Sequence, residues 1–153
     1  RGASIILMGT PLHASALCET LANWAARETI PARRVVLIPA GLMDDPCFSA
    51  QEDEVAALYL GRSLTRSRPD LFEPADTVAA MESRYGPDLD APDGLVRLFE
   101  SAPHAEKLRR VGLGHEVAWC AQVDIARAVP GVWHWLNNET PVLRAGLPSP
   151  VSG

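Results

Sequence analysis

The stretch RVVLIPAGLMDDPCFSAQEDEVAALYLGRSL, from Arg34 to Leu64, decides the fold that the sequence predicts. It begins with an apolar run from Val35 to Ile38, which ends at Pro39-Ala40-Gly41. A short continuous run of this kind is typical of an inner strand in a sheet that is covered on both faces. A polar loop follows, and then an amphipathic helix that opens with the acidic triplet Glu52-Asp53-Glu54.

Carboxylates gather after this predicted strand, because Asp44 and Asp45 lie in the loop and the acidic triplet begins the helix. In open α/β sheets, ligands bind outside the carboxyl ends of the strands. We therefore expect part of any chemistry at this end of the predicted sheet.

A second strand is predicted from Ile5 to Met8, closed by Gly9. Thr10 is the expected N-cap of the next helix, and Pro11 stands at its first position, where a missing N–H costs nothing. An apolar stripe at helical spacing extends to about Arg27, formed by Ala14, Leu17, Cys18, Leu21, Trp24 and Ala25.

Strand, helix and strand make a βαβ unit, which is expected to be parallel and right-handed. The predicted fold class is therefore α/β, as a three-layer α/β/α arrangement with a mostly parallel or mixed sheet. We expect residues 1–153 to form one domain that is part of a larger one, since the chain begins with Arg1 in place of methionine and enters a strand at once.

The remaining elements are mostly helical. Ser49 and Glu52 have the spacing of a capping box. Helices are expected at 75–84, from Leu95 and over 101–111, with a loop at 86–93 and Gly112 as C-cap. Residues 115–125 fit a strand or a helix, and we favour a helix. A terminal hairpin is predicted around a loop at 137–141, with a loose tail at 148–153.

Composition excludes several classes of function. A net charge of −5 without a basic stripe argues against nucleic acid as a partner. The sequence contains no run of about 18 apolar residues, so no membrane-spanning helix is predicted. Cys18, Cys47 and Cys120 have neither disulfide nor zinc-ribbon spacing, so we expect a cytoplasmic protein.

The order of these motifs resembles the carboxyl-terminal part of the 2-phosphosulfolactate phosphatases of coenzyme M biosynthesis. The resemblance covers roughly residues 4–132 and includes the segments MGTPLHASALCETL and SAPHAEKLRRVGLGHEVAWCAQVDIARAVP. It implies an α/β fold and hydrolysis of a small phosphate monoester with Mg²⁺. The matching positions are Ala40-Gly41, Glu52-Asp53, Ser101, His104, Leu108, Gly112, Cys120-Ala121, Asp124 and Val129-Pro130.

The chain departs from the family pattern at two positions. His13 stands where the family usually has asparagine, and Glu116 stands where it favours aspartate. The family's amino-terminal half, with its Asp/Arg and Gly-Thr motifs, has no counterpart in the sequence. Both facts support a second hypothesis, a non-catalytic α/β module or truncated paralogue that binds a small anion or a protein partner.

Glu52 and Asp53 are the predicted metal ligands, because Mg²⁺ takes few protein carboxylates and keeps several waters. The competing interpretation is that Glu52 only completes the capping box, while Asp53 only suits the helix dipole.

Thr10 and His13, at a strand-to-helix turn, and Ser101 are the predicted substrate-binding residues, since N–H groups at such a turn can hold an anion. The competing interpretation is a simple cap beside an exposed histidine. His104 and Glu116 are the predicted catalytic residues, with His104 donating to an anionic substrate or transferring a proton. His104 could equally be a surface histidine near a helix cap.

The first hypothesis is thus a Mg²⁺-dependent phosphatase that acts on a small anionic phosphate monoester similar to 2-phosphosulfolactate. Trp133 and Trp135 share one face of the predicted hairpin and offer a contact for another subunit or a partner.

Overall fold

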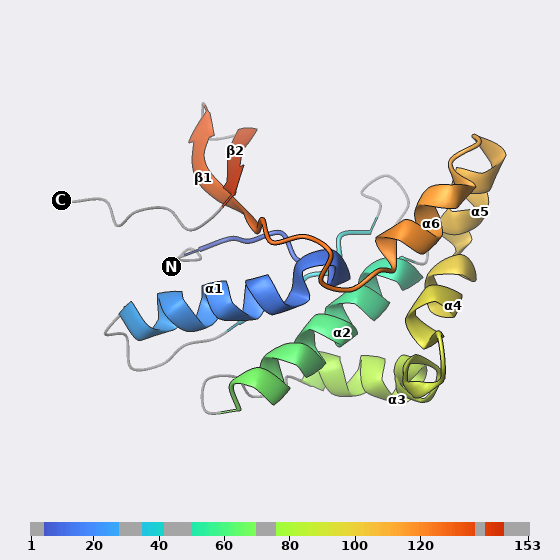
Figure 1. Ribbon diagram of the computed structural model, residues 1–153, viewed down its shortest axis with the longest axis horizontal. Coiled ribbons are helices and arrows are strands. Elements are labelled where there is room, and N and C mark those ends of the chain that lie inside the picture. The colour runs from blue at the N-terminus through green and yellow to red at the C-terminus, as the bar shows by residue number, and fades with distance from the viewer. Residues whose placement is uncertain (1–4, 28–34, 42–49, 70–75, 137–139, 146–153) are drawn as a thin grey trace.

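The computed structural model describes residues 5–27, 35–41, 50–69, 76–136 and 140–145, and Figure 1 shows their arrangement. These residues are mostly helical, with one short antiparallel sheet. In order, the elements are the 3₁₀ turn η1 (Pro11–His13), α1 (Ala14–Arg27), α2 (Gln51–Ser67), α3 (Asp76–Asp90), α4 (Gly94–Glu100), α5 (Pro103–Arg110), α6 (Gly114–Cys120), β1 (Pro130–Leu136) and β2 (Thr140–Ala145).

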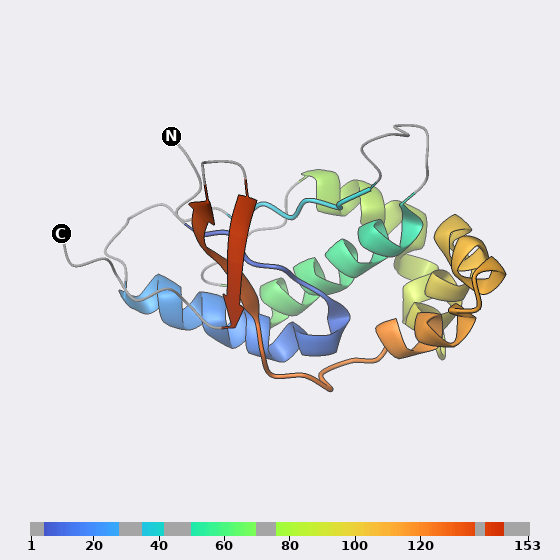
Figure 2. The same cartoon turned by 90° about the horizontal axis from the view of Figure 1, so that it is seen from above.

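Helix α2 is the centre of the molecule. In Figures 1 and 2, α1 and the hairpin lie at one end, α4, α5 and α6 lie at the other, and α2 runs between them. Val55 and Leu58 on one face are fully buried against side chains from α3, α4, α5 and α6. Leu60 and Leu64 on the opposite face pack against the apolar stripe of α1. Two core clusters therefore share one helix.

The predicted helix after Gly9 is confirmed, but its start is held differently from the prediction. Thr10 occupies the N-cap position of η1 without a side-chain capping bond. The carboxylate of Asp124 instead accepts hydrogen bonds from the backbone N–H of Ser15 at 2.7 Å and from its hydroxyl at 2.6 Å. Asp124 has a φ of +56°, a conformation that asparagine and aspartate tolerate better than most residues. An N–H group at the helix start thus finds its acceptor on a residue 109 positions away in the sequence.

The terminal hairpin is confirmed as two antiparallel strands, β1 and β2, although β2 begins at Thr140, inside the predicted loop. The first apolar segment pairs with β1 on its other side. Met8 donates its N–H to Pro130 O at 2.8 Å, and Val132 donates to Ile6 O at 2.9 Å. Leu7 and Gly131 form an antiparallel bridge. The side chains of Trp133 and Trp135 and the predicted tail at 148–153 lie outside what the structure describes.

The expected parallel sheet is not seen among the described residues. Segment 35–41 has no strand assignment there, and its side chains alternate in exposure. Val35 and Leu37 pack against the cluster around α1, whereas Val36 is 62% and Ile38 is 82% exposed. The chain is therefore of mixed α/β character with an antiparallel sheet, and the apolar run is covered on one face only. A continuous apolar run does not show whether one or both faces of the segment are covered by other elements. The sequence therefore could not distinguish a segment covered on one face from a strand covered on both.

Three further predictions about the helices differ from the structure. The capping box is wrong, since the N-cap of α2 is Ala50, and Ser49 lies outside the described residues. The predicted loop at 86–93 is also wrong in its first half, because α3 continues through Pro87 to Asp90. The favoured helix near His115 is confirmed for 114–120 only. Gly112 has a φ of +83°, as expected after the end of a helix. No helix in the described ranges combines the length and apolar character of a membrane span.

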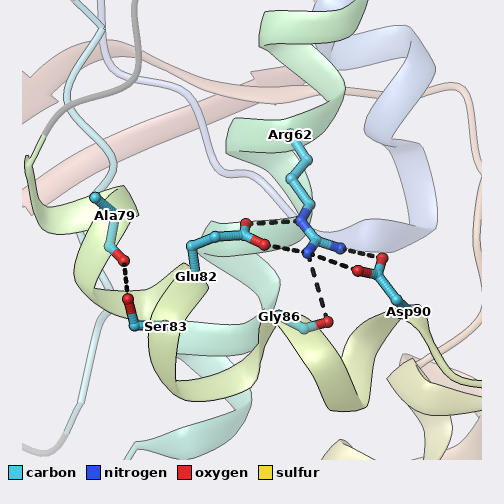
Figure 3. Close-up of polar contacts among 6 residues, drawn as sticks. All are labelled: Arg62, Ala79, Glu82, Ser83, Gly86 and Asp90. Carbon is cyan, nitrogen blue, oxygen red and sulfur yellow. Dashed lines mark hydrogen bonds and ion pairs between the residues drawn. The ribbon is translucent and has the colours of Figure 1, made fainter.

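An ion cluster joins α2 to α3, where Arg62 of α2 faces Glu82, Gly86 and Asp90 of α3 (Figure 3). The side chain of Arg62 is only 14% exposed and makes paired bonds to Glu82, one of them from Nε to Oε2 at 2.8 Å. Its Nη1 also donates to Asp90 at 2.8 Å, and the Gly86 carbonyl oxygen lies 3.5 Å from Nη2. The guanidinium lowers the pKa of Glu82 through these hydrogen bonds.

Replacing Arg62 by methionine should lower the free energy of unfolding by about 1 to 2 kcal/mol at neutral pH, less than for a fully buried pair, because both carboxylates stay hydrated. The pKa of Glu82 is lowered in the folded state, so the stabilisation is complete above about pH 4.3 and is lost as pH falls through the lowered value.

Urea unfolding at pH 7 and pH 3 would measure this, with Arg66→Met at an exposed site as the matched control. An equal loss at both pH values would contradict an electrostatic origin.

Candidate functional site

The first turn of α2 is held by its side chains, because its N-cap residue, Ala50, provides no capping bond. The four residues of this turn, Gln51-Glu52-Asp53-Glu54, each reach a different part of the chain. Carboxylates at a helix N-terminus also interact favourably with the helix dipole. This turn therefore joins segments that are far apart in the sequence, and we call it the acidic turn.

Glu52 binds His104 of α5 across the gap between the two helices. Oε1 of Glu52 lies 2.8 Å from Nδ1 of His104, and the Glu52 side chain is 19% exposed. A carboxylate only accepts, so Nδ1 of the histidine carries the proton in this contact. Oε2 of Glu52 is buried and finds no hydrogen-bond partner among the residues that the structure describes. An unpaired buried oxygen of this kind is costly, and such atoms are rare in native proteins.

Ser101 joins the same neighbourhood through Gln51. The amide nitrogen of Gln51 donates to Leu98 O at 2.7 Å and to the hydroxyl of Ser101 at 2.9 Å. The Ser101 hydroxyl itself donates to Leu98 O at 3.2 Å. Gln51 thereby fixes the turn between α4 and α5, two residues before the start of the helix that carries His104.

Asp53 binds the segment that precedes the acidic turn. Its Oδ2 accepts the backbone N–H of Gly41 at 2.9 Å. Gly41 has a φ of +66°, a conformation that glycine adopts at little cost. This contact confirms the prediction that the end of segment 35–41 and the acidic turn lie together, although the segment is not a strand among the described residues.

Glu54 binds α3. The hydroxyl of Tyr85 donates to Oε2 of Glu54 at 2.5 Å, and Nη1 of Arg84 lies 3.2 Å from the same oxygen. The guanidinium of Arg84 also stands 4.8 Å from the centre of the Tyr85 ring. Burial, and then the hydrogen bond to Glu54, raise the pKa of Tyr85 to about 12.

The other predicted substrate-binding residues lie elsewhere. His13 is 6% exposed and binds Met8 O through Nε2 at 3.0 Å, with its Nδ1 3.5 Å from Oγ1 of Thr10. Gly9, next to this turn, packs against the side chain of Leu60, eight residues or about 12 Å along α2 from Glu52. The nearby N–H of Ser15 is already bonded to Asp124. The structure therefore gives Thr10 and His13 local partners.

Glu116 projects from α6 and is exposed. Within the described part of the chain no hydrogen bond to its carboxylate is found. Burial, and then the charge of Glu116, raise the pKa of the Cys120 thiol. Burial likewise raises the pKa of Cys18, so neither thiol is set up as a nucleophile.

The residues of the acidic turn fit a magnesium ion to a limited extent. No group of three or more His, Cys, Asp or Glu side chains that could hold a metal occurs among the residues that the structure describes. Mg²⁺, however, needs only one or two carboxylates and completes its shell with water and substrate oxygens. The unpaired Oε2 of Glu52 and the second oxygen of Asp53 are ligands of the right kind. Asp44 and Asp45 lie outside the described residues.

The sequence interpretation missed three contributors to this site: Gln51, Glu54 and Tyr85. A glutamine and a third acid in the first turn were visible, but their partners lie 47 and 31 residues away. Tyr85 was followed by Gly86 and Pro87, which indicated a loop and hid its position in a helix.

The Glu52–His104 contact should show a coupling of about 1 kcal/mol in a double-mutant cycle of stability, because Glu52 is mostly buried and its partner bond is short. The variants are Glu52→Ala, His104→Ala and the double variant, compared by urea unfolding at neutral pH.

The matched control is the exposed pair Glu106–Arg110, at 3.2 Å on α5. We expect its coupling to be about 0.3 to 0.5 kcal/mol. A Glu52–His104 coupling no larger than this would contradict a stronger bond at the partly buried Glu52.

Tyr85 should make the protein sensitive to alkali. Its pKa lies near 12 in the folded protein and near 10 when unfolded, so its stabilising effect is complete below pH 10 and is lost as pH rises between these values. Between pH 10 and 12 the wild type should lose up to roughly 2 to 3 kcal/mol more than Tyr85→Phe. Unfolding curves of both proteins across this range provide the measurement, and parallel curves would contradict the burial of the phenol.

None of the curated proteins matches the chain. The family model of 2-phosphosulpholactate phosphatase matches residues 1–133, which is most of the 153-residue chain. The matched range contains the acidic turn, α5 with His104, and Asp124. The chain therefore belongs to the 2-phosphosulpholactate phosphatase family.

Proposed function

We propose that this protein is a Mg²⁺-dependent phosphatase of a small phosphate monoester such as 2-phosphosulpholactate, with its chemistry at the acidic turn. The observation that carries the proposal is the Glu52–His104 pair, in which the other buried carboxylate oxygen of Glu52 has no hydrogen-bond partner among the described residues. Membership of the family supports a phosphate-ester substrate. The geometry supports this place in the fold, because Glu52 binds His104 there, and the neighbouring residues Gln51 and Asp53 bind Ser101 and Gly41.

Glu52 and Asp53 hold the metal in this proposal. Each already uses one carboxylate oxygen, for His104 and for Gly41, and each keeps a second oxygen. When bound, Mg²⁺ neutralises charge on the phosphoryl oxygens and so favours in-line attack. The hydrogen bonds to His104 and Gly41 fix the orientation of the two carboxylates, which is the usual way in which a protein shapes a metal site.

His104 moves the proton. Its bond to Glu52 places the proton on Nδ1, so Nε2 is the ring atom that exchanges protons with substrate or water. When the ring carries a proton on Nε2 as well, it can give that proton to the departing alkoxide of the ester. Alkoxides are poor leaving groups, so a proton delivered at that oxygen lowers the barrier.

Ser101 can bind an anionic oxygen of the substrate without disturbing its surroundings. Its hydroxyl donates to Leu98 O, but that carbonyl also accepts the amide of Gln51. If the hydroxyl turns toward an anion, Leu98 O therefore keeps a donor. Thr10, His13 and Glu116 stay predictions, since the described contacts give them other surroundings.

Phosphate release from 2-phosphosulpholactate, measured with and without Mg²⁺, tests the proposal directly. Asp53→Asn and Glu52→Gln should lower kcat/KM by about 100-fold or more, because each removes a charge from the metal site. Glu106→Gln on α5 makes the same charge change at an exposed ion pair and should leave turnover unchanged.

Magnesium binding, followed by calorimetry, gives a second result that does not depend on turnover. The wild type should bind Mg²⁺ and Asp53→Asn should bind it at least tenfold more weakly. A folded wild type that neither binds Mg²⁺ nor releases phosphate would overturn the proposal and favour a non-catalytic binding module.

A further inference from the structure

The acidic turn lacks the usual means of holding a helix start. Ala50 at the N-cap has no side-chain acceptor, and the N–H groups of Asp53 and Glu54 bond to Ala50 O. Helix ends without a capping side chain are prone to fray. Yet Glu52, whose position relative to His104 matters for the proposed chemistry, stands in this turn. The side-chain contacts of the turn with neighbouring elements must therefore keep it in place.

We infer that Tyr85 is a positioning residue for this site: its hydroxyl, held by the core, binds Glu54 and so keeps Glu52 opposite His104. The expected effect of Tyr85 on catalysis rests on the proposed function. Its expected effect on the position of Glu52 rests on the contacts alone.

Tyr85 is well suited to act as a fixed point. It is 5% exposed and belongs to the same core cluster as Val55 and Leu58, one turn and two turns after the acidic turn begins. Its ring therefore cannot move without disturbing that cluster. Its hydroxyl lies 2.5 Å from Oε2 of Glu54, and Arg84 donates to the same oxygen at 3.2 Å. Two donors from α3 thus hold one carboxylate of α2.

The acidic turn is gripped on different sides by Tyr85 and His104. Glu54 and Glu52 are two positions apart, so their side chains leave the helix on different sides. One is bound by α3 and the other by α5. If Glu54 is released, the turn loses this bond to α3, and the Glu52–His104 distance is held by fewer contacts, chiefly those of Gln51 and Asp53. Displacements of about 1 Å are enough to cost orders of magnitude in rate.

Tyr85→Phe tests this inference, because phenylalanine keeps the buried ring and removes only the hydroxyl. The matched control is Tyr59→Phe. Tyr59 lies in α2, is partly buried against both core clusters, and its hydroxyl makes no hydrogen bond among the described residues. Both variants should fold, as circular dichroism would show.

The kinetic result expected is a fall in kcat of about tenfold for Tyr85→Phe, with KM changed less than about twofold, and no change for Tyr59→Phe. Glu54→Gln should retain most of kcat, because its amide oxygen still accepts from Tyr85. Glu54→Ala should behave like Tyr85→Phe, and the double variant should lose no more than either single one.

A spectroscopic result separates this inference from the proposed function. Nitrogen-15 NMR of the ring of His104 should show the proton on Nδ1 in the wild type and in Tyr59→Phe. In Tyr85→Phe the two tautomers should become mixed. If the wild type has no turnover, the proposed function fails while this measurement still decides the positioning role. Wild-type kcat and an unchanged His104 spectrum in Tyr85→Phe would overturn the inference, as would equal losses in both tyrosine variants.

Discussion

The burial of α2 on two opposite faces is the constraint on which the rest of the structure depends. Val55 and Leu58 are fully buried on one face, and Leu60 and Leu64 are 3% exposed on the other. A helix that is apolar on two faces has little perimeter left for polar groups. The acidic turn at its N-terminus and Arg62 supply hydrogen bonds from α2 to other elements. Every neighbouring element meets α2 either through an apolar cluster or through one of these polar groups.

This arrangement explains why so many polar contacts of α2 are long-range. A half-buried charge is tolerated when it has a partner, and the partner must come from whichever element packs nearby. Arg62 therefore pairs with carboxylates of α3, and the acidic turn pairs with α3, α5 and the segment that ends at Gly41. Asp124 does the same for the start of α1. The helices are consequently joined by side chains from distant parts of the sequence more than by local capping.

The sequence was a good guide wherever the deciding interaction is local. The apolar stripe of α1 predicted most of its buried residues, and the acid-rich start of α2 lies next to the segment that ends at Gly41, as predicted. The sequence was a poor guide where contacts with distant parts of the chain determine the local structure. Thr10 has the chemistry of a cap, but Asp124 takes that role, and Pro87 looked like a helix breaker although α3 continues past it. The apolar run from Val35 to Ile38 likewise could not reveal that its outer face is uncovered.

The unpaired oxygen of Glu52 is where stability and the proposed chemistry meet. Asp53 and Glu54 each have a donor for a carboxylate oxygen, whereas Oε2 of Glu52 is buried and finds none among the described residues. A buried carboxylate oxygen without a donor costs free energy. Under the proposed function, a cation at this oxygen would remove that cost, and the ion would bind more tightly for that reason.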